Sequence, residues 1–167
     1  MKQKIIDGII KKTGIPDLID VLVDRLSFSE LQSLLLKIFE LKTKKKSSND
    51  ILSEYQSNRF VKPSDINPVI LRNLELKIFS LLPSDFELIE LSPLTPIGTA
   101  SVLTTTHQNN VISTIRNTEV AADTTNILAL ECAKRRKEWL TSKTVKLCSS
   151  QRLTRGQPFE DKNFSAH

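Results

Sequence analysis

Residues that build disulfides, metal sites and histidine-centred catalysis are scarce in this sequence of 167 residues. Its two cysteines, Cys132 and Cys148, have neither a CxxC motif nor a histidine beside them. We therefore expect two free thiols, no disulfide framework and no structural metal. The two histidines, His107 and His167, are far apart in the sequence, so a histidine-centred base or metal cluster is not expected.

Long apolar runs are also missing, since no stretch approaches the roughly 18 residues that a membrane-spanning helix needs. The N-terminus, MKQKIIDGIIKKTG, lacks the order of charged, apolar and small residues that marks a signal peptide. We therefore expect a cytoplasmic protein without a membrane partner. The whole sequence is 39% hydrophobic and 26% charged. This composition is typical of a globular chain, so neither disorder nor a coiled-coil fibre is expected.

Positive charge is concentrated at the two ends of the chain. The net charge is +5, and residues 1–46 and 121–167 each carry a net charge of +4, so the segment between them is mildly acidic. Basic ends of this kind suit RNA or a phosphorylated ligand. The alternative is that the lysines are solvated, because positive charge such as the Lys44-Lys45-Lys46 triplet is also favourable where a helix ends.

The first part of the chain predicts helices. Apolar residues recur at helical spacing through residues 1–41, with two breaks, and Ser27 or Ser29 with Glu30 is a start signal for the last helix. We expect a helical appendage without catalytic chemistry. The leucine-rich face of residues 18–41 would pack within it or bind a partner helix.

The rest of the chain predicts a linker followed by alternating helices and strands. Residues 42–67, rich in lysine, serine and proline, read as the linker, with one short helix near 51–55. The elements expected in residues 68–167 are a helix over 68–82, strands at 86–91 and 110–116, a helix from Asp123 to about Leu140, and strands at 144–148 and 151–155. The fold class is therefore α+β: an N-terminal helical segment, then part of an antiparallel sheet flanked by helices.

The familiar catalytic signatures, including GxxxxGK[ST], GxGxxG, GxSxG and HExxH, do not occur in this sequence. Arg152 and Arg155 are the strongest candidates for binding a ligand, because arginine binds phosphate oxygens through a planar fork and stays charged. They lie three residues apart on an expected strand, so they point to opposite faces and only one can face a ligand. The alternative is a pair of surface arginines.

Three segments resemble class II aminoacyl-tRNA synthetases, nearest to histidyl-tRNA synthetase and its relative, the regulatory subunit of ATP phosphoribosyltransferase. The sequence FELIELSPL over residues 86–94 is similar to motif 1, and Asp123-Thr124-Thr125 is similar to the acidic–x–Thr segment of the histidyl branch. The sequence VKLCSSQRLTRGQPF over residues 145–159 is similar to motif 2. The three segments occur in the family's order.

The resemblance implies roles for particular residues. Arg155 would hold the α-phosphate of ATP, accompanied by magnesium, and Arg152 would lie on the strand before it. Asp123 or Glu119, together with Thr125, would bind the substrate amino acid. The family's chemistry needs no catalytic nucleophile, and its motif 1 builds a homodimer interface.

The resemblance covers only part of a class II core. Ala121-Ala122 replaces the arginine and proline that usually precede the acidic–x–Thr segment, and a motif 3 does not occur in the sequence. We therefore expect the chain to be the N-terminal portion of a synthetase-like protein, with a partial ATP and amino-acid site and little or no activity alone. The alternative hypothesis is a non-catalytic regulatory protein that binds nucleic acid or a protein partner.

Overall fold

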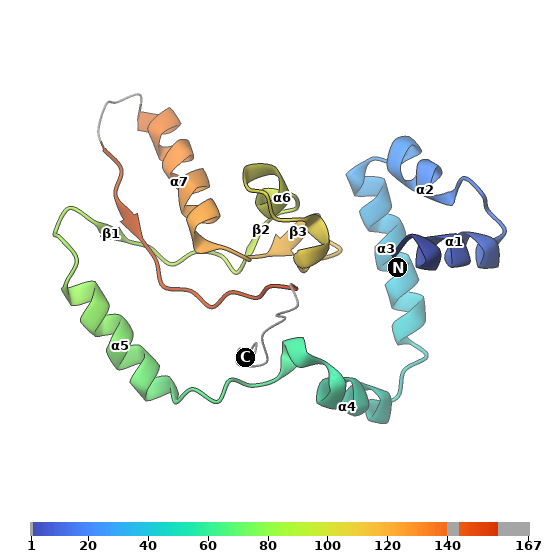
Figure 1. The fold of residues 1–167 in the computed structure, drawn as a ribbon, viewed down its shortest axis with the longest axis horizontal. Helices are drawn as coiled ribbons and strands as arrows, with labels where there is room; N and C mark the ends of the chain where they lie inside the picture. Colours follow the sequence, from blue (N-terminus) through green and yellow to red (C-terminus); the bar gives the residue numbers. More distant parts are fainter. Residues whose placement is uncertain (1, 140–143, 157–167) are drawn as a thin grey trace. The chain divides into compact units, whose positions relative to one another are not determined.

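The computed structural model describes residues 2–139 and 144–156, and the chain divides into two compact units. The N-terminal unit consists of residues 1–46 with 115–117, and the C-terminal unit consists of residues 47–114 with 118–167. Figure 1 shows the elements of both. Within the described residues, no helix is both long enough and apolar enough to cross a membrane.

The N-terminal unit is helical, as the sequence predicts. It contains α1 (Lys2–Thr13), α2 (Leu18–Asp20), a short π-helix over Val21–Arg25 and α3 (Phe28–Thr43). Gly14 follows α1 with φ +69°, a left-handed conformation that suits glycine where a helix ends. The expected start of α3 is confirmed, because Ser27 and Glu30 form a reciprocal capping box.

The C-terminal unit begins with two helices. Helix α4 (Ser48–Ser57) is longer than the short helix expected near 51–55. Ser47 and Asp50 form a second capping box, which starts the helix at Ser48. A 3-10 turn over Arg59–Val61 follows. Helix α5 (Pro68–Ser80) begins as expected, with Pro68 in its first turn and the Asn67 side chain accepting a hydrogen bond from the Val69 amide.

The remaining elements of this unit alternate between short strands and helices. They are β1 (Glu87–Leu88), β2 (Leu94–Pro96), α6 (Thr99–Leu103), a 3-10 turn (Gln108–Asn110), β3 (Thr118–Val120), α7 (Thr124–Trp139) and β4 (Leu147–Cys148). Strands β2 and β3 pair antiparallel, with Thr95 opposite Glu119. Strands β1 and β4 pair parallel, with Glu87 opposite Leu147.

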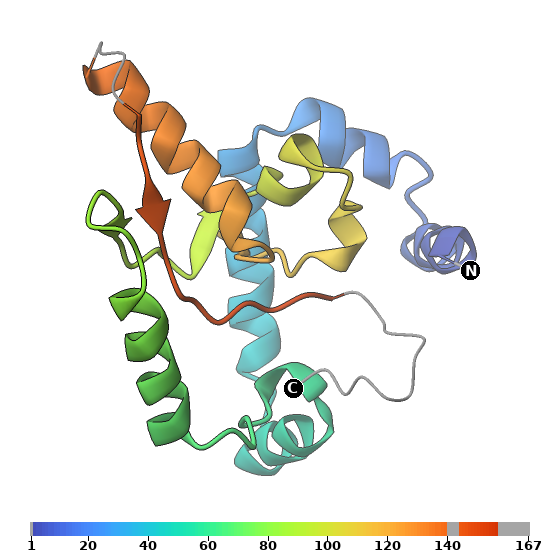
Figure 2. The same cartoon turned by 60° about the vertical axis from the view of Figure 1, so that its left-hand side comes forward.

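The mixture of helices with small sheets agrees with an α+β fold. The sequence predicts a largely antiparallel sheet. Among the described residues the β2–β3 pair and the Ser113–Glu119 bridge are antiparallel, whereas the β1–β4 pair is parallel. A parallel pair needs a long crossover between its strands, and the chain between β1 and β4, which includes α6 and α7, supplies one. Figure 2 shows β4 beside α7, with the segment after β4 running past the start of that helix.

The strand expected over 110–116 is found only in part. Residues 108–110 form the 3-10 turn, and the chain then reverses at Asn117, whose φ of 54° is left-handed. Asparagine adopts this conformation more readily than most residues. Only the stretch around Ser113 therefore lies against β3, through a single bridge to Glu119.

The described part of the C-terminal unit has a small core. Its buried apolar side chains are those of Ala100, Val111, Ala121 and Ala122. Thr95, Thr99, Glu119 and Asn126 are buried with them. A charged glutamate in so small a core needs hydrogen-bond partners, because an unpaired buried charge is costly.

Candidate functional site

Glu119 lies in the middle of β3 with only 1% of its surface exposed. One carboxylate oxygen, Oε1, accepts a hydrogen bond from the Ala100 amide at 2.8 Å. The other, Oε2, accepts hydrogen bonds from the Gly98 amide and from Nε2 of Gln108, both at 2.8 Å. We call these four residues the Glu119 cluster. These contacts attach β3 to the loop before α6 and to the first turn of α6. Backbone amides at the start of a helix favour a negatively charged partner.

Polar contacts around the cluster reinforce it. The Thr95 and Thr99 hydroxyls are 2.8 Å apart, and the Ser101 hydroxyl donates to Oε1 of Gln108 at 2.6 Å. Gly98 has φ +91°, a left-handed conformation that suits glycine, at the residue whose N–H donates to the Glu119 carboxylate. Sequence reasoning singled out Glu119 and missed Gln108, because a lone glutamine in a threonine-rich loop carries no recognisable signal.

Asp123 stands immediately before α7 and makes two contacts. Its Oδ1 accepts a hydrogen bond from the Thr125 amide at 2.8 Å, which caps the helix as the sequence predicts. Its Oδ2 is 3.2 Å from Nη2 of Arg155. The side chains of Asp123 and Arg155 are 39% and 50% exposed, so both are open to solvent. We call this contact the Asp123–Arg155 pair.

Arg155 is positioned by the backbone as well as by Asp123. Its Nε donates to the Ala122 carbonyl at 2.6 Å. The Thr154 amide donates to the Ala121 carbonyl at 3.3 Å, so the segment similar to motif 2 runs beside the end of β3. Two of the predicted site residues, 32 positions apart in the sequence, are thus adjacent in the fold.

The remaining predicted site residues lie in different surroundings. Thr125 is exposed and contributes its backbone amide to the Asp123 cap. Arg152 is exposed and lies near Glu75 of α5. The pKa of Glu75 is lowered chiefly by a hydrogen bond from the Ser150 hydroxyl, with smaller contributions from Arg72 and then Arg152. The strand expected over 151–155 is wrong, since residues 151–156 have no regular secondary structure after β4 ends at Cys148. Arg152 lies near α5, and Arg155 lies at the start of α7.

A cleft of about 740 Å³ lies between the segment 89–96 and helix α7. Its walls are mostly apolar, with Ile89, Leu91, Leu94, Ile127 and Leu130 among the lining residues. Beside it, Arg135 of α7 pairs with Glu87 of β1 and with Glu131, whose Oε1 is 2.8 Å from Nε. These contacts join α7 to β1, and they raise the pKa of Arg135 above its ordinary value.

Cys132 and Cys148 are both free thiols, as expected. The described residues contain no group of three or more histidine, cysteine, aspartate or glutamate side chains that could hold a metal ion. In comparisons with known proteins, no family model, curated protein or solved structure matches the chain. The geometry of the chain's own residues is therefore the basis for assigning it a function.

Proposed function

We propose that this chain carries part of a class II synthetase-like site, in which Arg155 binds a phosphate of ATP and Asp123 binds the amine of an amino acid. The observation that carries the proposal is the Asp123–Arg155 pair itself. It brings the acidic–x–Thr segment and the segment similar to motif 2 into direct contact at the start of α7.

The geometry leaves the Arg155 guanidinium able to meet a ligand. Nε is occupied by the Ala122 carbonyl, which fixes the plane of the fork, while half of the side chain remains exposed. An arginine held in this way loses less conformational freedom when it binds a phosphate. Magnesium would arrive with the ATP, and no protein residue is assigned to it.

The same geometry favours Asp123 over Glu119 as the residue that receives an amine. Both oxygens of Glu119 already accept hydrogen bonds inside the core, and only 1% of the residue is exposed. Asp123 is 39% exposed and can exchange its contact with Arg155 for a contact with a ligand cation. Within the proposal, Glu119 holds β3 in place just before this site.

The proposed chemistry is positioning and charge stabilisation, without a protein nucleophile. Because no motif 3 occurs in the sequence, we expect this chain to bind ATP without efficient amino-acid activation. Amino-acid-dependent pyrophosphate exchange checks the second half of this expectation, since robust turnover by the 167-residue chain would contradict it.

Isothermal titration of the full chain with ATP and magnesium tests the site. Arg155→Ala should weaken ATP binding by more than about tenfold, since a charge-assisted contact contributes about 1.5–3 kcal/mol. Arg152→Ala is the matched control, because this arginine is three residues away and exposed, and it should bind nearly as the unsubstituted chain does. Absence of ATP binding by a folded chain, or equal losses in both variants, would refute the proposal.

An exposed stripe on α5 supports a second part of the proposal, a homodimer. Leu71, Phe79 and Leu82 are half-buried, whereas four further apolar residues recur along a neighbouring face. That face consists of Ile70, Leu74 and Ile78 of α5 and of Leu81, which follows the last residue of the helix. These residues are 66%, 53%, 49% and 76% exposed. The helix precedes the segment similar to motif 1, so a second copy could cover the stripe.

Sedimentation of the chain over a range of concentrations tests the homodimer. Leu74→Lys should shift a dimer to monomer, because a charge at the centre of the stripe would have to be buried. Val102→Lys is the control, since Val102 is 81% exposed and lies outside α5. A chain that is monomeric at all concentrations would exclude the homodimer and leave the ATP proposal untouched.

A further inference from the structure

Helix α3 has a wider apolar face than the N-terminal unit covers. Leu31 and Leu35 are half-buried, while Leu34, Ile38 and Leu41 remain 42%, 38% and 50% exposed. These three exposed residues have the i, i+4, i+7 spacing that places side chains in line on one side of a helix. We call them the α3 stripe, and it extends for about 10 Å at 1.5 Å per residue.

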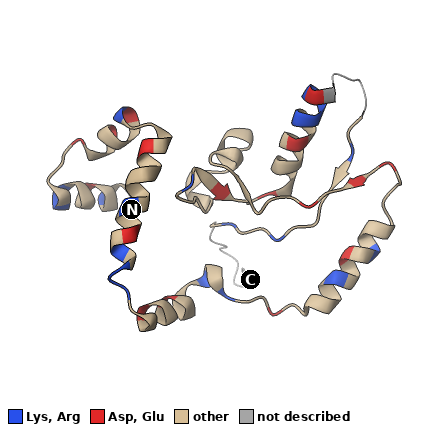
Figure 3. Ribbon diagram, turned by 180° about the vertical axis from the view of Figure 1, so that it is seen from behind, with Lys and Arg blue, Asp and Glu red and all other residues tan. Residues whose placement is uncertain are grey.

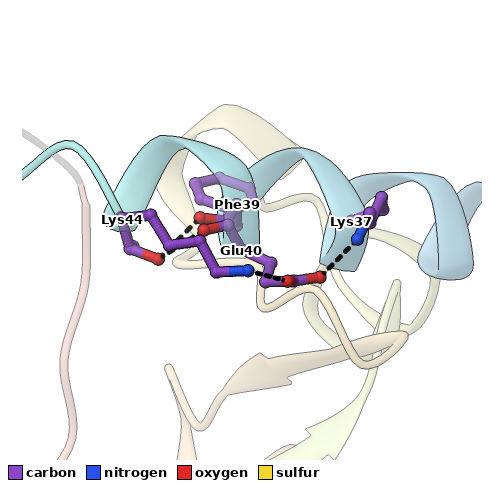
Figure 4. A network of polar contacts seen from close by, with 5 residues as sticks. Lys37, Phe39, Glu40 and Lys44 are labelled. Atoms are coloured by element: carbon purple, nitrogen blue, oxygen red, sulfur yellow. Dashed lines mark hydrogen bonds and ion pairs between the residues drawn. The ribbon is translucent and has the colours of Figure 1, made fainter.

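A row of charged side chains runs beside the stripe. Figure 4 shows Glu40 between Lys37 and Lys44 along α3, with distances of 2.8 Å and 2.5 Å from Glu40 to the two lysine nitrogens. We call these three residues the Glu40 row. The side chains of Lys37 and Lys44 are 63% and 67% exposed, so they can interact with a partner while they are paired with Glu40.

The end of the helix adds further positive charge. Residues 37–46 contain five lysines and one glutamate, which gives this segment a net charge of +4. Figure 3 shows the run of basic residues where α3 ends. Positive charge therefore predominates beside and after the stripe, since residues 30–46 hold five lysines against two glutamates, Glu30 and Glu40.

We propose that the α3 stripe is a docking surface for an acidic amphipathic helix of a partner protein. The helical spacing of the stripe matches the apolar face of a second helix, and the lysines complement acidic residues that flank such a face. A second copy of α3 would bring a like charge and is disfavoured. This inference is independent of the ATP site.

Fluorescence anisotropy with the full chain and a labelled synthetic helix tests the proposal. The probe is a peptide of about 20 residues, long enough to be helical, with leucines at i, i+4, i+7 and i+11 and glutamates beside them. The matched control peptide has lysine in place of every glutamate. The acidic peptide should bind and the basic peptide should not, and equal binding of the two would overturn the charge argument.

Variants of the chain locate the surface. Ile38→Ser should weaken binding of the acidic peptide by about tenfold, since it removes the central apolar contact. Val23→Ser is the control in the same unit, because Val23 is 69% exposed and lies outside α3. Equal effects of the two substitutions would overturn the assignment to the stripe.

Charge reversal provides a second variant that leaves the stripe intact. Lys42→Glu with Lys45→Glu should weaken binding of the acidic peptide and strengthen binding of the basic one. Failure of the acidic peptide to bind, together with binding of the chain to phosphatidylserine vesicles or to a uridine oligonucleotide, would overturn the proposal in favour of a membrane surface or RNA.

Discussion

Two carboxylates in this protein receive similar numbers of contacts in opposite surroundings. Glu119 is buried, and its three donors come from residues 11 to 21 positions away. Glu40 has a side chain that is 46% exposed, and its two lysine partners lie three and four positions away on the same helix. The first carboxylate depends on the tertiary fold, whereas the second needs only the helix that carries it.

Burial determines how much each of these contacts stabilises the fold. A buried carboxylate that loses a donor leaves a charge away from water, so each partner of Glu119 matters to the C-terminal unit. An exposed ion pair gains little, because water and salt replace its contacts. The Glu119 cluster should therefore respond to substitution much more strongly than the Glu40 row.

The largest effect is expected for Glu119→Gln. The amide replaces one accepting oxygen by an NH2 group that faces an N–H donor, so we expect destabilisation of about 2–3 kcal/mol. Urea unfolding followed by circular dichroism measures it. Glu40→Gln is the matched control and should lower the urea midpoint only slightly. Equal shifts in the two variants would remove the distinction between buried and exposed carboxylates.

A smaller loss is expected for Gly98→Ala. The added Cβ would lie 3.5 Å from Cγ2 of Val102, which is ordinary contact, so the cost comes from the left-handed φ of +91° and amounts to about 1–2 kcal/mol. Gly8→Ala is the control within α1, where nothing lies within 4 Å of the new Cβ, and it should stabilise that helix. Destabilisation by both, in thermal unfolding, would contradict the conformational argument.

Ser27→Ala tests how much a contact between near neighbours in the sequence contributes to stability. The substitution removes the oxygen that accepts the Glu30 amide and should cost about 1 kcal/mol. Because the chain has two units, hydrogen exchange of the α3 amides measures the local effect better than a global transition does. Faster exchange confined to the start of α3 is the expected result, and faster exchange in the Glu119 cluster would show that the effect is not local.

The smallest effect is the pH dependence of the Glu40 row. Hydrogen bonds from Lys37 and then Lys44 lower the pKa of Glu40 in the folded state. The contribution of the row is thus complete above the ordinary glutamate pKa of about 4.3 and is lost as pH falls through the lowered value. Thermal midpoints of the unsubstituted chain and of Glu40→Gln should differ slightly at neutral pH and converge in acid. A difference between the two thermal midpoints that grows as pH falls would contradict the prediction.

The features that the sequence predicts well depend on neighbouring residues. The capping box of Ser27 and Glu30 and the cap at Asp123 mark helix starts that the structure confirms. Helix α7 is described over Thr124–Trp139, and its expected end near Leu140 lies outside the described residues. Caps and apolar spacing act within one or two turns, so these elements can be read from a short stretch of sequence.

The features that the sequence does not predict depend on distant residues. The parallel direction of β1 and β4 depends on how the intervening chain crosses over, and the shortened strand near Ser113 depends on the left-handed turn at Asn117. The role of Gln108 depends on a carboxylate 11 positions away. The proximity of Asp123 and Arg155 was expected only through a family resemblance, because residue spacing alone does not bring them together.

The pairing of β1 with β4 also sets the order in which the C-terminal unit can assemble. Glu87 and Leu147 are sixty residues apart, so on a ribosome β1 cannot pair with β4 until residues 147–148 have been synthesised. Closing so long a loop costs conformational entropy, and this cost comes before the two short strands form their hydrogen bonds. Helices α5 and α7 can form earlier, and the segment that carries β4 and Ser150 then contacts both of them.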